Sequence, residues 1–391
     1  MIRVQRPFFF RGRVPFSKSW LARALILRSL HPQVRILDWE AGPADGEDVQ
    51  FLDAALKHFA SGGTDFHIGE SGTGLRFLLA RLSVQKGLYT IAGSERLLSR
   101  PHTELIRVLS QLGATVERIA PTKLKVEAAG WPSFSSEASG SQAPVEILVD
   151  GSESSQFRSA LLLAASHIQD PKARPHFVGK NEVSRGYLEM TEDLVDQVIS
   201  RGRRVLVPEP DASSIATLAA IVKPGAPESG ATTAHASEAE FLWRELEFLR
   251  TQVEGTKQPD RAFFHLHQLP EADLTDAPDL FPVLAALASC GLGPCVLKGA
   301  PHLRHKETDR IAEIEKLLSL VGVEFETRTD GIVITPISKA GRTEWERRRK
   351  QGFAYQYSPP SDHRLAFAAA VLAAQGAPIE FHGRGMVAKS F

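Results

Sequence analysis

Cationic side chains stand where helices are expected to begin, which is the unfavourable end of a helix for a positive charge. Lys18 opens the run SKSWLARALIL, Arg364 opens SDHRLAFAAAVLAA, and Lys306 and Arg310 lie together in HKETDR. The dipole and the unpaired N–H groups of a first helical turn suit each position to an anion. Four such cations favour a shared anionic ligand.

Carboxylates accompany these cations. Glu307 and Arg310 lie three residues apart and should share a helix face, close to Lys306. A solvated salt-bridge cluster is the alternative interpretation of this motif. Asp276, in DAPDLF, is expected to cap a helix. Asp279, in the same motif, is either a second capping carboxylate or a site carboxylate. The histidines show no short metal-binding spacing, so no metal is expected.

The elements that must position these residues repeat along the chain. Six short, nearly uncharged helices are expected, opened by Ser17, Ser71, Ser152, Asp211, Asp276 and Ser361. The last three follow the first three at offsets of 194 (17 to 211), 205 (71 to 276) and 209 (152 to 361) residues, near half of the chain. Such an offset indicates an internal duplication with three similar units in each half.

A second type of helix alternates with the first. HTELIRVLSQLGATVE, GYLEMTEDLVDQVIS, AEFLWRELEFLRTQVE and HKETDRIAEIEKLLSLVGVEFE are amphipathic, and VEILVD, RRVLVP and DGIVITPI are typical of strands. The sequence therefore predicts an α/β protein of two similar lobes. Each lobe has three repeated βαβ-type units with the apolar helices buried inside, an inverted α/β barrel.

Composition excludes some functions. Lys plus Arg and Asp plus Glu both number 46 in 391 residues, so no net charge draws the chain to nucleic acid or membranes. Two cysteines, Cys290 and Cys295, fit a reducing compartment. The N-terminal apolar run is too short for a signal peptide. Residues 280–297 are uncharged but contain Pro and Gly, which favours a buried helix followed by a strand over a membrane span. A cytoplasmic protein is expected.

Five motifs in order, DGSESSQF, SRPHTEL, KETDRIAEI, DHRLAFA and VAKSF, resemble the family of 5-enolpyruvylshikimate-3-phosphate synthases. The resemblance covers nearly the whole chain. It implies a monomer whose two lobes close on the substrates, with the chain crossing between them around Phe16 and Pro210. The expected lobes are therefore residues 1–15 plus 210–391, and residues 16–209.

The resemblance also implies two neighbouring substrate sites and no cofactor. The expected shikimate-3-phosphate site comprises Lys18, Ser19, Arg23, Ser154, Ser155, Gln156, Ser184, Tyr187, Asp279 and Lys306. The expected phosphoenolpyruvate site comprises Lys18, Gly72, Thr73, Arg100, Gln156, Glu307, Arg310, Arg364 and Lys389. Two multiply charged anions side by side need such cations and amide donors to offset their repulsion.

The implied reaction is an addition–elimination. Asp279 would be the base for the 5-hydroxyl of the acceptor, Glu307 the proton shuttle for the enolpyruvyl methylene, and Lys18 a further acid. Enolpyruvyl would pass from phosphoenolpyruvate to shikimate-3-phosphate in the cleft between the lobes, and phosphate would leave.

Some residues depart from the family pattern. Glu70 stands where Asn is usual, Phe77 where Pro is common, and His302 where Asn is expected; the segment from Tyr187 to Asp211 is short, and the chain stops directly after VAKSF. Two alternatives stay open. One is an enolpyruvyl transferase for a UDP-amino sugar, which would need a cysteine in a mobile loop. The other is a non-catalytic relative that binds a phosphorylated ligand.

Overall fold

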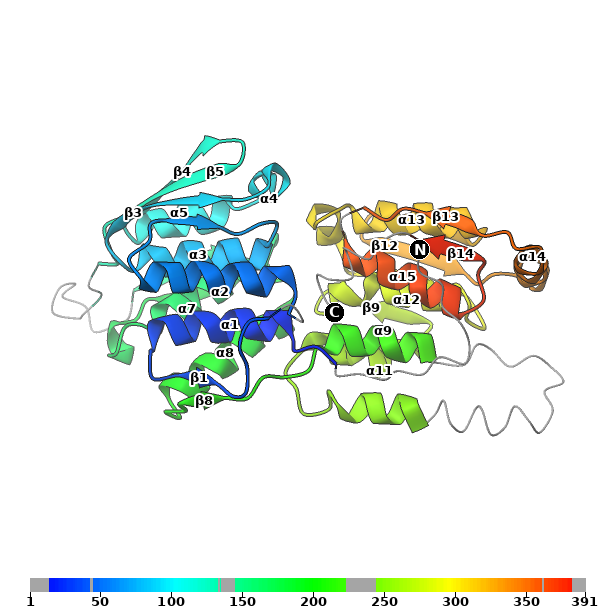
Figure 1. Ribbon diagram of the computed structural model, residues 1–391, viewed down its shortest axis with the longest axis horizontal. Helices are drawn as coiled ribbons and strands as arrows, with labels where there is room; N and C mark the ends of the chain where they lie inside the picture. The colour runs from blue at the N-terminus through cyan, green and yellow to red at the C-terminus, as the bar shows by residue number, and fades with distance from the viewer. Residues whose placement is uncertain are drawn as a thin grey trace. The chain divides into compact units, whose positions relative to one another are not determined.

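The computed structural model describes residues 14–42, 45–132, 134, 145–222, 244–360 and 362–381. The chain divides into two compact units, which are Phe16–Glu209 and the combination of Met1–Pro15 with Pro210–Phe391 (Figure 1). Each unit has its own apolar core.

Three apolar helices form the interior of the unit Phe16–Glu209. They are α1 (Lys18–Leu30), α3 (Gly72–Ser83) and α7 (Gln156–Ala165), and each packs against the other two. In α3 every residue except Thr73 is buried, which is why its sequence lacks a polar face. The other helices in the described part of this unit are α2 (Glu47–Ala60), α4 (Glu95–Ser99), α5 (Thr103–Gln111), α8 (Arg185–Ile199) and the short 3-10 helix η1 (Pro171–Ala173).

Small sheets accompany these helices. One sheet has the order β2 (Asp65–His67), β3 (Gly87–Ala92), β5 (Lys123–Ala128), β4 (Ala114–Ala120). Two parallel pairs are β6 (Glu146–Asp150) with β7 (His176–Lys180), and β1 (Arg35–Ile36) with β8 (Val205–Leu206). Because β2 is parallel to β3, and β6 to β7, α3 and α7 are the crossover helices of βαβ units.

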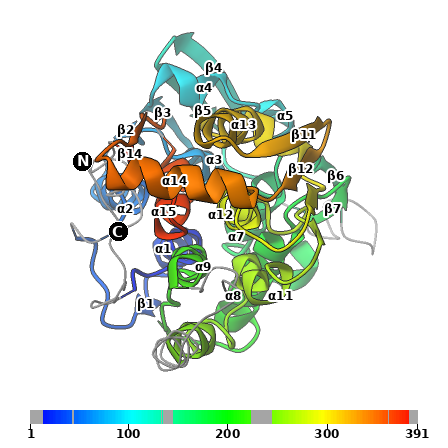
Figure 2. The same cartoon turned by 90° about the vertical axis from the view of Figure 1, so that its right-hand side faces the viewer.

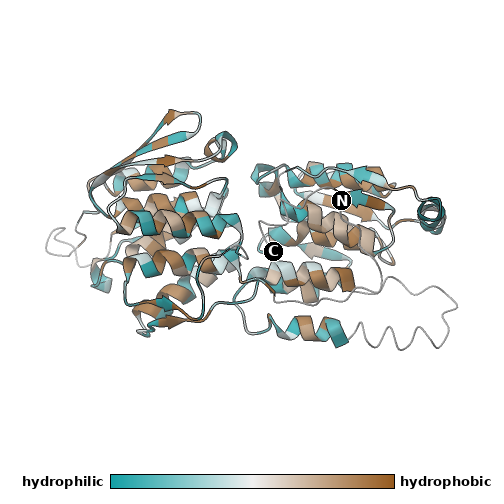
Figure 3. Ribbon diagram, in the orientation of Figure 1, coloured by the Kyte–Doolittle hydropathy of each residue, from teal (hydrophilic) through white to brown (hydrophobic). Residues whose placement is uncertain are grey.

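The second unit repeats this helical arrangement. Its interior helices α9 (Ala212–Val222), α12 (Phe281–Ala288) and α15 (His363–Ala374) pack against one another. Among the residues that are described, its other helices are residues 244–251, α11 (Phe263–Leu266), α13 (Arg310–Val321), α14 (Lys339–Lys350), and the 3-10 helices η2 (Pro259–Ala262), η3 (Pro278–Leu280) and η4 (Pro301–His305). Helix α14, which is hydrophilic in Figure 3, lies at the front of Figure 2.

The strand order is repeated as well. The order β9 (Glu271–Asp273), β10 (Cys295–Lys298), β12 (Gly331–Thr335), β11 (Glu324–Arg328) has the same directions as the order β2, β3, β5, β4. The parallel pair β13 (Tyr355–Tyr357) and β14 (Ile379–Phe381) matches β6 and β7. This confirms the predicted α/β fold with buried helices. Within the described ranges the strands form separate sheets and no closed barrel.

Several predicted element boundaries were wrong. Ser17 and Ser71 do cap α1 and α3, and Asp211 accepts a bond from the Ser214 amide at 2.7 Å. However, α7 begins at Gln156 rather than near Ser152, and η3 intervenes before α12, so that Ala277 rather than Asp276 stands at the cap position before η3. Ser361 lies outside the described residues, and Asp362 caps α15.

Two of the predicted amphipathic helices are shorter than expected. In both cases a glycine ends the helix and the last residues of the run enter a strand, ATVE in β4 and EFE in β11. Residues 280–297 form α12 and β10, as predicted. None of the helices in the described ranges is long and apolar enough to cross a membrane.

The N-cap of α3 gives a first test. Ser71→Ala should lower the free energy of unfolding by about 1–2 kcal/mol, because the buried Ser71 hydroxyl accepts from the Gly74 amide at 3.0 Å. Ser338 makes the corresponding bond to Gly341 at 3.1 Å on the exposed helix α14, so Ser338→Ala is the matched control with a smaller expected loss. Thermal unfolding of both variants measures the difference, and equal losses would contradict the role of burial.

Candidate functional site

The first turn of α1 carries two of the predicted site residues. Lys18 is the first helical residue, and its Nζ lies 3.6 Å from an Asp48 carboxylate oxygen on α2. Ser19 is half-buried, and its carbonyl accepts a hydrogen bond from Arg23 one turn later at 2.6 Å. The positive charge of Lys18 at the start of α1 is therefore paired only weakly, by a long contact with Asp48.

Arg23 is a buried cation with neutral partners. Its guanidinium donates to Thr191 Oγ1 at 2.7 Å and to the carbonyl oxygens of Ser19 and Tyr187 at 2.6 and 2.9 Å. It also lies over the rings of Phe77 and Tyr187, at 5.3 and 5.9 Å from their centroids. Burial lowers the Arg23 pKa to about 10, partly offset by Tyr187. These contacts hold the guanidinium in place without neutralising its charge.

The start of α3 lies against Arg100. A Cβ placed on Gly72 would come within 2.8 Å of Arg100 Nη1 and 3.1 Å of its Cζ. Only glycine therefore lets the guanidinium approach the first turn of this helix, where amide groups are available to an anion. Thr73, the half-buried second residue of α3, accepts from Gln156 Nε2 at 2.8 Å.

Arg76 is a site residue that the sequence analysis missed. Its Nη1 donates to Ser154 Oγ at 3.1 Å and to Gln156 Oε1 at 2.6 Å, and its Nη2 donates to the Pro101 carbonyl at 3.1 Å. It thereby joins the motif DGSESSQF to the first turns of α3. The signal was an arginine inside an otherwise apolar helix, since such a residue almost always has a specific partner.

His102 completes this group. Its Nδ1 lies 3.4 Å from Arg76 Nε and accepts from it, so Nε2 carries the proton and donates to the Leu97 carbonyl at 2.9 Å. Burial, and next the charge of Arg76, lower the His102 pKa to about 4. The ring is thus neutral and supports the position of Arg76.

The other predicted residues of this unit lie at helix starts. Ser155 is buried directly before α7, and Ser184 is buried before α8 with a left-handed backbone (φ 55°). Tyr187 is half-buried on the first turn of α8. Of the departures from the family pattern, Glu70 is exposed and Phe77 is a core residue beneath Arg23.

Arg310 is the centre of the site residues in the second unit. Its Nε donates to Asp362 at 2.6 Å, its Nη1 to Asp279 at 2.7 Å and its Nη2 to Glu307 at 2.8 Å. Its side chain is only 2% exposed. The alternative of a solvated salt-bridge cluster was therefore wrong. The predicted shared helix face was also wrong, because α13 begins at Arg310 and Glu307 lies in the preceding turn.

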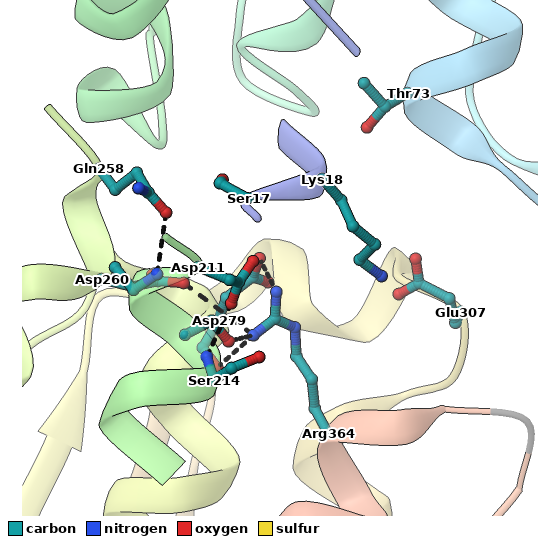
Figure 4. A network of polar contacts seen from close by, with 12 residues as sticks. Ser17, Lys18, Thr73, Asp211, Ser214, Gln258, Asp260, Asp279, Glu307 and Arg364 are labelled. Atoms are coloured by element: carbon teal, nitrogen blue, oxygen red, sulfur yellow. Dashed lines mark hydrogen bonds and ion pairs between the residues drawn. The ribbon is translucent and has the colours of Figure 1, made fainter. Parts of the chain in front are cut away.

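Arg364 is the second cation of this network (Figure 4). Its Nη2 donates to Asp279 Oδ2 at 2.7 Å, and its Nη1 donates to the Ser213 hydroxyl and lies 4.0 Å from Asp260. Asp279 therefore bridges two arginines, one through each oxygen, and is not a helix cap.

Charge coupling shifts the pKa values of this network. Burial alone would raise the pKa of Asp279, but the charges of Arg364, Arg310 and Lys306 outweigh it and hold the pKa well below its usual value. Burial alone would lower the pKa of Arg310, but the charges of Asp362, Glu307 and Asp279 outweigh burial and hold the pKa well above its usual value. Both groups are held in their charged forms.

Lys306 and His302 lie close to Asp279. Lys306 is half-buried at the end of η4. His302 is buried in η4, and neither ring nitrogen has a hydrogen-bond partner within the described part of the chain. Burial, and next the charge of Lys306, lower the His302 pKa to about 4. Lys389 lies outside the described residues. The residues that are described include no group of three or more potential metal ligands.

The buried side chains of His102 and His302 predict a pH dependence of stability. Their folded pKa values of about 4 lie below the usual value near 6.5, so between these values the unfolded state binds more protons. Stability should therefore fall as the pH drops from about 6.5 to about 4. Thermal unfolding across this range should show a shallower loss for His102→Gln than for the wild type. Superimposable curves would contradict a neutral, buried ring.

Comparisons with known proteins agree with these arrangements. Residues 26–391 match the family model for EPSP synthase (3-phosphoshikimate 1-carboxyvinyltransferase). A 3-phosphoshikimate 1-carboxyvinyltransferase of Bordetella petrii is 28% identical, with 97% of this chain and 92% of the relative covered. One of Methanospirillum hungatei is 29% identical, with coverages of 94% and 90%.

Solved structures show the same fold. An EPSP synthase from Acinetobacter baumannii has a TM-score of 0.60 at 18% identity, covering 97% of this chain and 92% of that one. The enolpyruvyl transferase NikO from Streptomyces tendae has a TM-score of 0.59 at 13% identity, with coverages of 100% and 94%. With a family model that matches nearly the whole chain, this protein belongs to the EPSP synthase family.

Proposed function

We propose that this chain is a 3-phosphoshikimate 1-carboxyvinyltransferase, which transfers the enolpyruvyl group of phosphoenolpyruvate to the 5-hydroxyl of shikimate-3-phosphate and releases phosphate. The observation that carries the proposal is the family match over residues 26–391, together with the buried arginines of each unit, Arg23 and Arg76 in one and Arg310 and Arg364 in the other. The reaction belongs to the shikimate pathway of aromatic amino acid biosynthesis.

The acceptor is assigned to the residues around Arg23. Its neutral partners leave a positive charge for an anionic group of shikimate-3-phosphate, and the hydroxyls of Ser154 and Ser155 add neutral donors. Ser19, Ser184, Tyr187, Gln156, Lys306 and Asp279 complete the assignment. Arg76 acts as a positioning residue through Ser154 and Gln156.

Phosphoenolpyruvate is assigned to Arg100, Arg310 and Arg364, with Lys18, Gly72, Thr73, Gln156, Glu307 and Lys389. Glu307 protonates the methylene carbon, with Lys18 as a further acid. The acceptor oxygen then forms a bond to the adjacent carbon, and its proton passes to Asp279. Loss of a proton from the new methyl group and cleavage of the carbon–oxygen bond to phosphate complete the elimination.

The two alternatives are less well supported. A UDP-amino-sugar transferase would need a cysteine in a mobile loop, whereas Cys290 is buried after α12 and Cys295 lies on β10. A non-catalytic binding protein has no need for carboxylates on the arginines that bind its anion, yet Asp279 and Glu307 both contact Arg310. A monomeric, cytoplasmic enzyme without a cofactor stays a prediction.

Phosphate release is the decisive assay. The purified protein should release phosphate only when shikimate-3-phosphate and phosphoenolpyruvate are present together, because the hydroxyl of one attacks the other. Glu307→Gln should lower kcat by about 100-fold or more, since the amide cannot transfer the proton. Glu313 and Lys316 form an ion pair on α13, and Glu313→Gln, which removes only this pair, is the control. Turnover with a UDP-amino sugar instead, or near-full activity of Glu307→Gln, would refute these assignments.

Gly72 tests the assignment of phosphoenolpyruvate. Gly72→Ala places a methyl group within 2.8 Å of Arg100 Nη1, so the guanidinium must move. The KM for phosphoenolpyruvate should rise about tenfold, as expected for a cost of about 1–2 kcal/mol from overpacking. The KM for shikimate-3-phosphate should change little. Gly255→Ala, whose Cβ would meet nothing within 4 Å, is the matched control. Equal effects on both KM values would count against a role of Arg100 in binding phosphoenolpyruvate.

A further inference from the structure

Three carboxylates hold the Arg310 guanidinium, and their exposures differ. The side chain of Asp362 is 0% exposed, that of Asp279 14% and that of Glu307 33%. Asp362 also caps α15 by accepting from the Arg364 amide at 3.1 Å. Asp362 is therefore a fixed partner of Arg310, whereas Asp279 and Glu307 are placed where a ligand can reach them.

Asp279 occupies the donor atoms that an anion would use. One oxygen accepts from Arg310 Nη1 and the other from Arg364 Nη2, both at 2.7 Å. A phosphate or carboxylate binds arginine through the same nitrogen atoms, often two at once. An anion that binds Nη1 of Arg310 and Nη2 of Arg364 in the same bridging arrangement therefore competes with Asp279 for these donors.

We propose that Asp279 is an exchangeable intramolecular ligand of Arg310 and Arg364, which an incoming phosphate- or carboxylate-bearing substrate displaces from both guanidinium groups. The displaced carboxylate then becomes available to the acceptor hydroxyl. The identity of the anion as phosphoenolpyruvate rests on the proposed function, but the exchange itself requires only an anion.

The exchange would couple substrate binding to base strength. While Asp279 bridges the two arginines, the pKa of its carboxyl is held well below its usual value, so it is a poor proton acceptor. An anion that takes over both guanidinium groups removes the largest lowering contributions, and the pKa rises. Asp279 thus gains basicity only when the second substrate is in place. By linkage, whatever weakens the Asp279 pairs must strengthen anion binding.

Sulfate alone tests the exchange without any turnover. Asp279→Asn keeps the shape of the side chain but removes the competing charge, so the variant should bind sulfate about tenfold more tightly than the wild type in calorimetry at pH 7. Its melting temperature should also rise more per increment of sulfate. Asp273 lies on β9, and its carboxylate accepts hydrogen bonds from Thr275. Asp273→Asn is the matched control and should bind sulfate like the wild type. The double variant Asp279→Asn/Arg364→Gln should lose the gain.

Glu307→Gln serves as a second variant, because removing Asp279 leaves two arginines less compensated and can prevent folding. Glu307 is more exposed, and its replacement removes the charge that pairs with Arg310 Nη2 at 2.8 Å, so a gain of several-fold in sulfate affinity is expected. Folded variants that bind sulfate no more tightly than the wild type would overturn the exchange, as would a gain that persists in the double variant. The phosphate-release assay on the wild type tests the proposed function separately, so either idea can fail alone.

Discussion

The pairing of Arg310 with three carboxylates is the interaction on which the second unit depends. A guanidinium that is only 2% exposed would cost several kcal/mol if left uncompensated. Its partners come from the turn before α13, from η3 and from the cap of α15. One side chain thus fixes three segments that lie up to 52 residues from it in the sequence. The same contact brings Asp279 and Glu307 together, so the carboxylates proposed for chemistry are placed by the interaction that stabilises the unit.

The two units repeat one fold, but their buried arginines contact different kinds of group. Arg23 donates to a hydroxyl and to carbonyl groups, which hold a guanidinium without cancelling its charge. Arg310 and Arg364 donate to carboxylates. A charge left uncancelled favours binding of an anion, whereas a carboxylate beside it supplies a group that can carry a proton. The duplicated units thus differ in chemistry, because one holds a buried arginine with neutral partners and the other pairs its arginines with carboxylates that can carry a proton.

Local signals in the sequence predicted more of the fold than of the site. Ser17 and Ser71 were recognisable because a capping side chain bonds an amide three residues away. The helix start predicted at Ser152 was wrong because the turn before α7 contains the same residue types that cap helices. The duplication was visible as an offset, but the repeated strand order was not, since register depends on partners far apart in the chain.

Local sequence signals also limited the prediction of the site residues. Cations at helix starts attracted attention because they oppose the dipole, and this misfit indicated an anion. For Arg310 and Arg364 the anion is already built in, as Asp362 and Asp279. No local pattern could reveal this, because those carboxylates lie 31 to 85 residues away from the arginines except at the cap of α15. Arg76 was missed for the converse reason, because it lies inside a helix rather than at its start and its partners are 78 and 80 residues distant.

A site that carries its own anions must give them up in order to bind a substrate. The Asp362 pair is too deeply buried for that, and it stabilises the fold whether or not a ligand is present. The Asp279 and Glu307 pairs are partly exposed, so solvent screening reduces their contribution to stability and an anion of higher charge can compete for the same donors. Division of one arginine's partners into a fixed carboxylate and two displaceable ones lets the unit keep its fold while its charge is rearranged around a substrate.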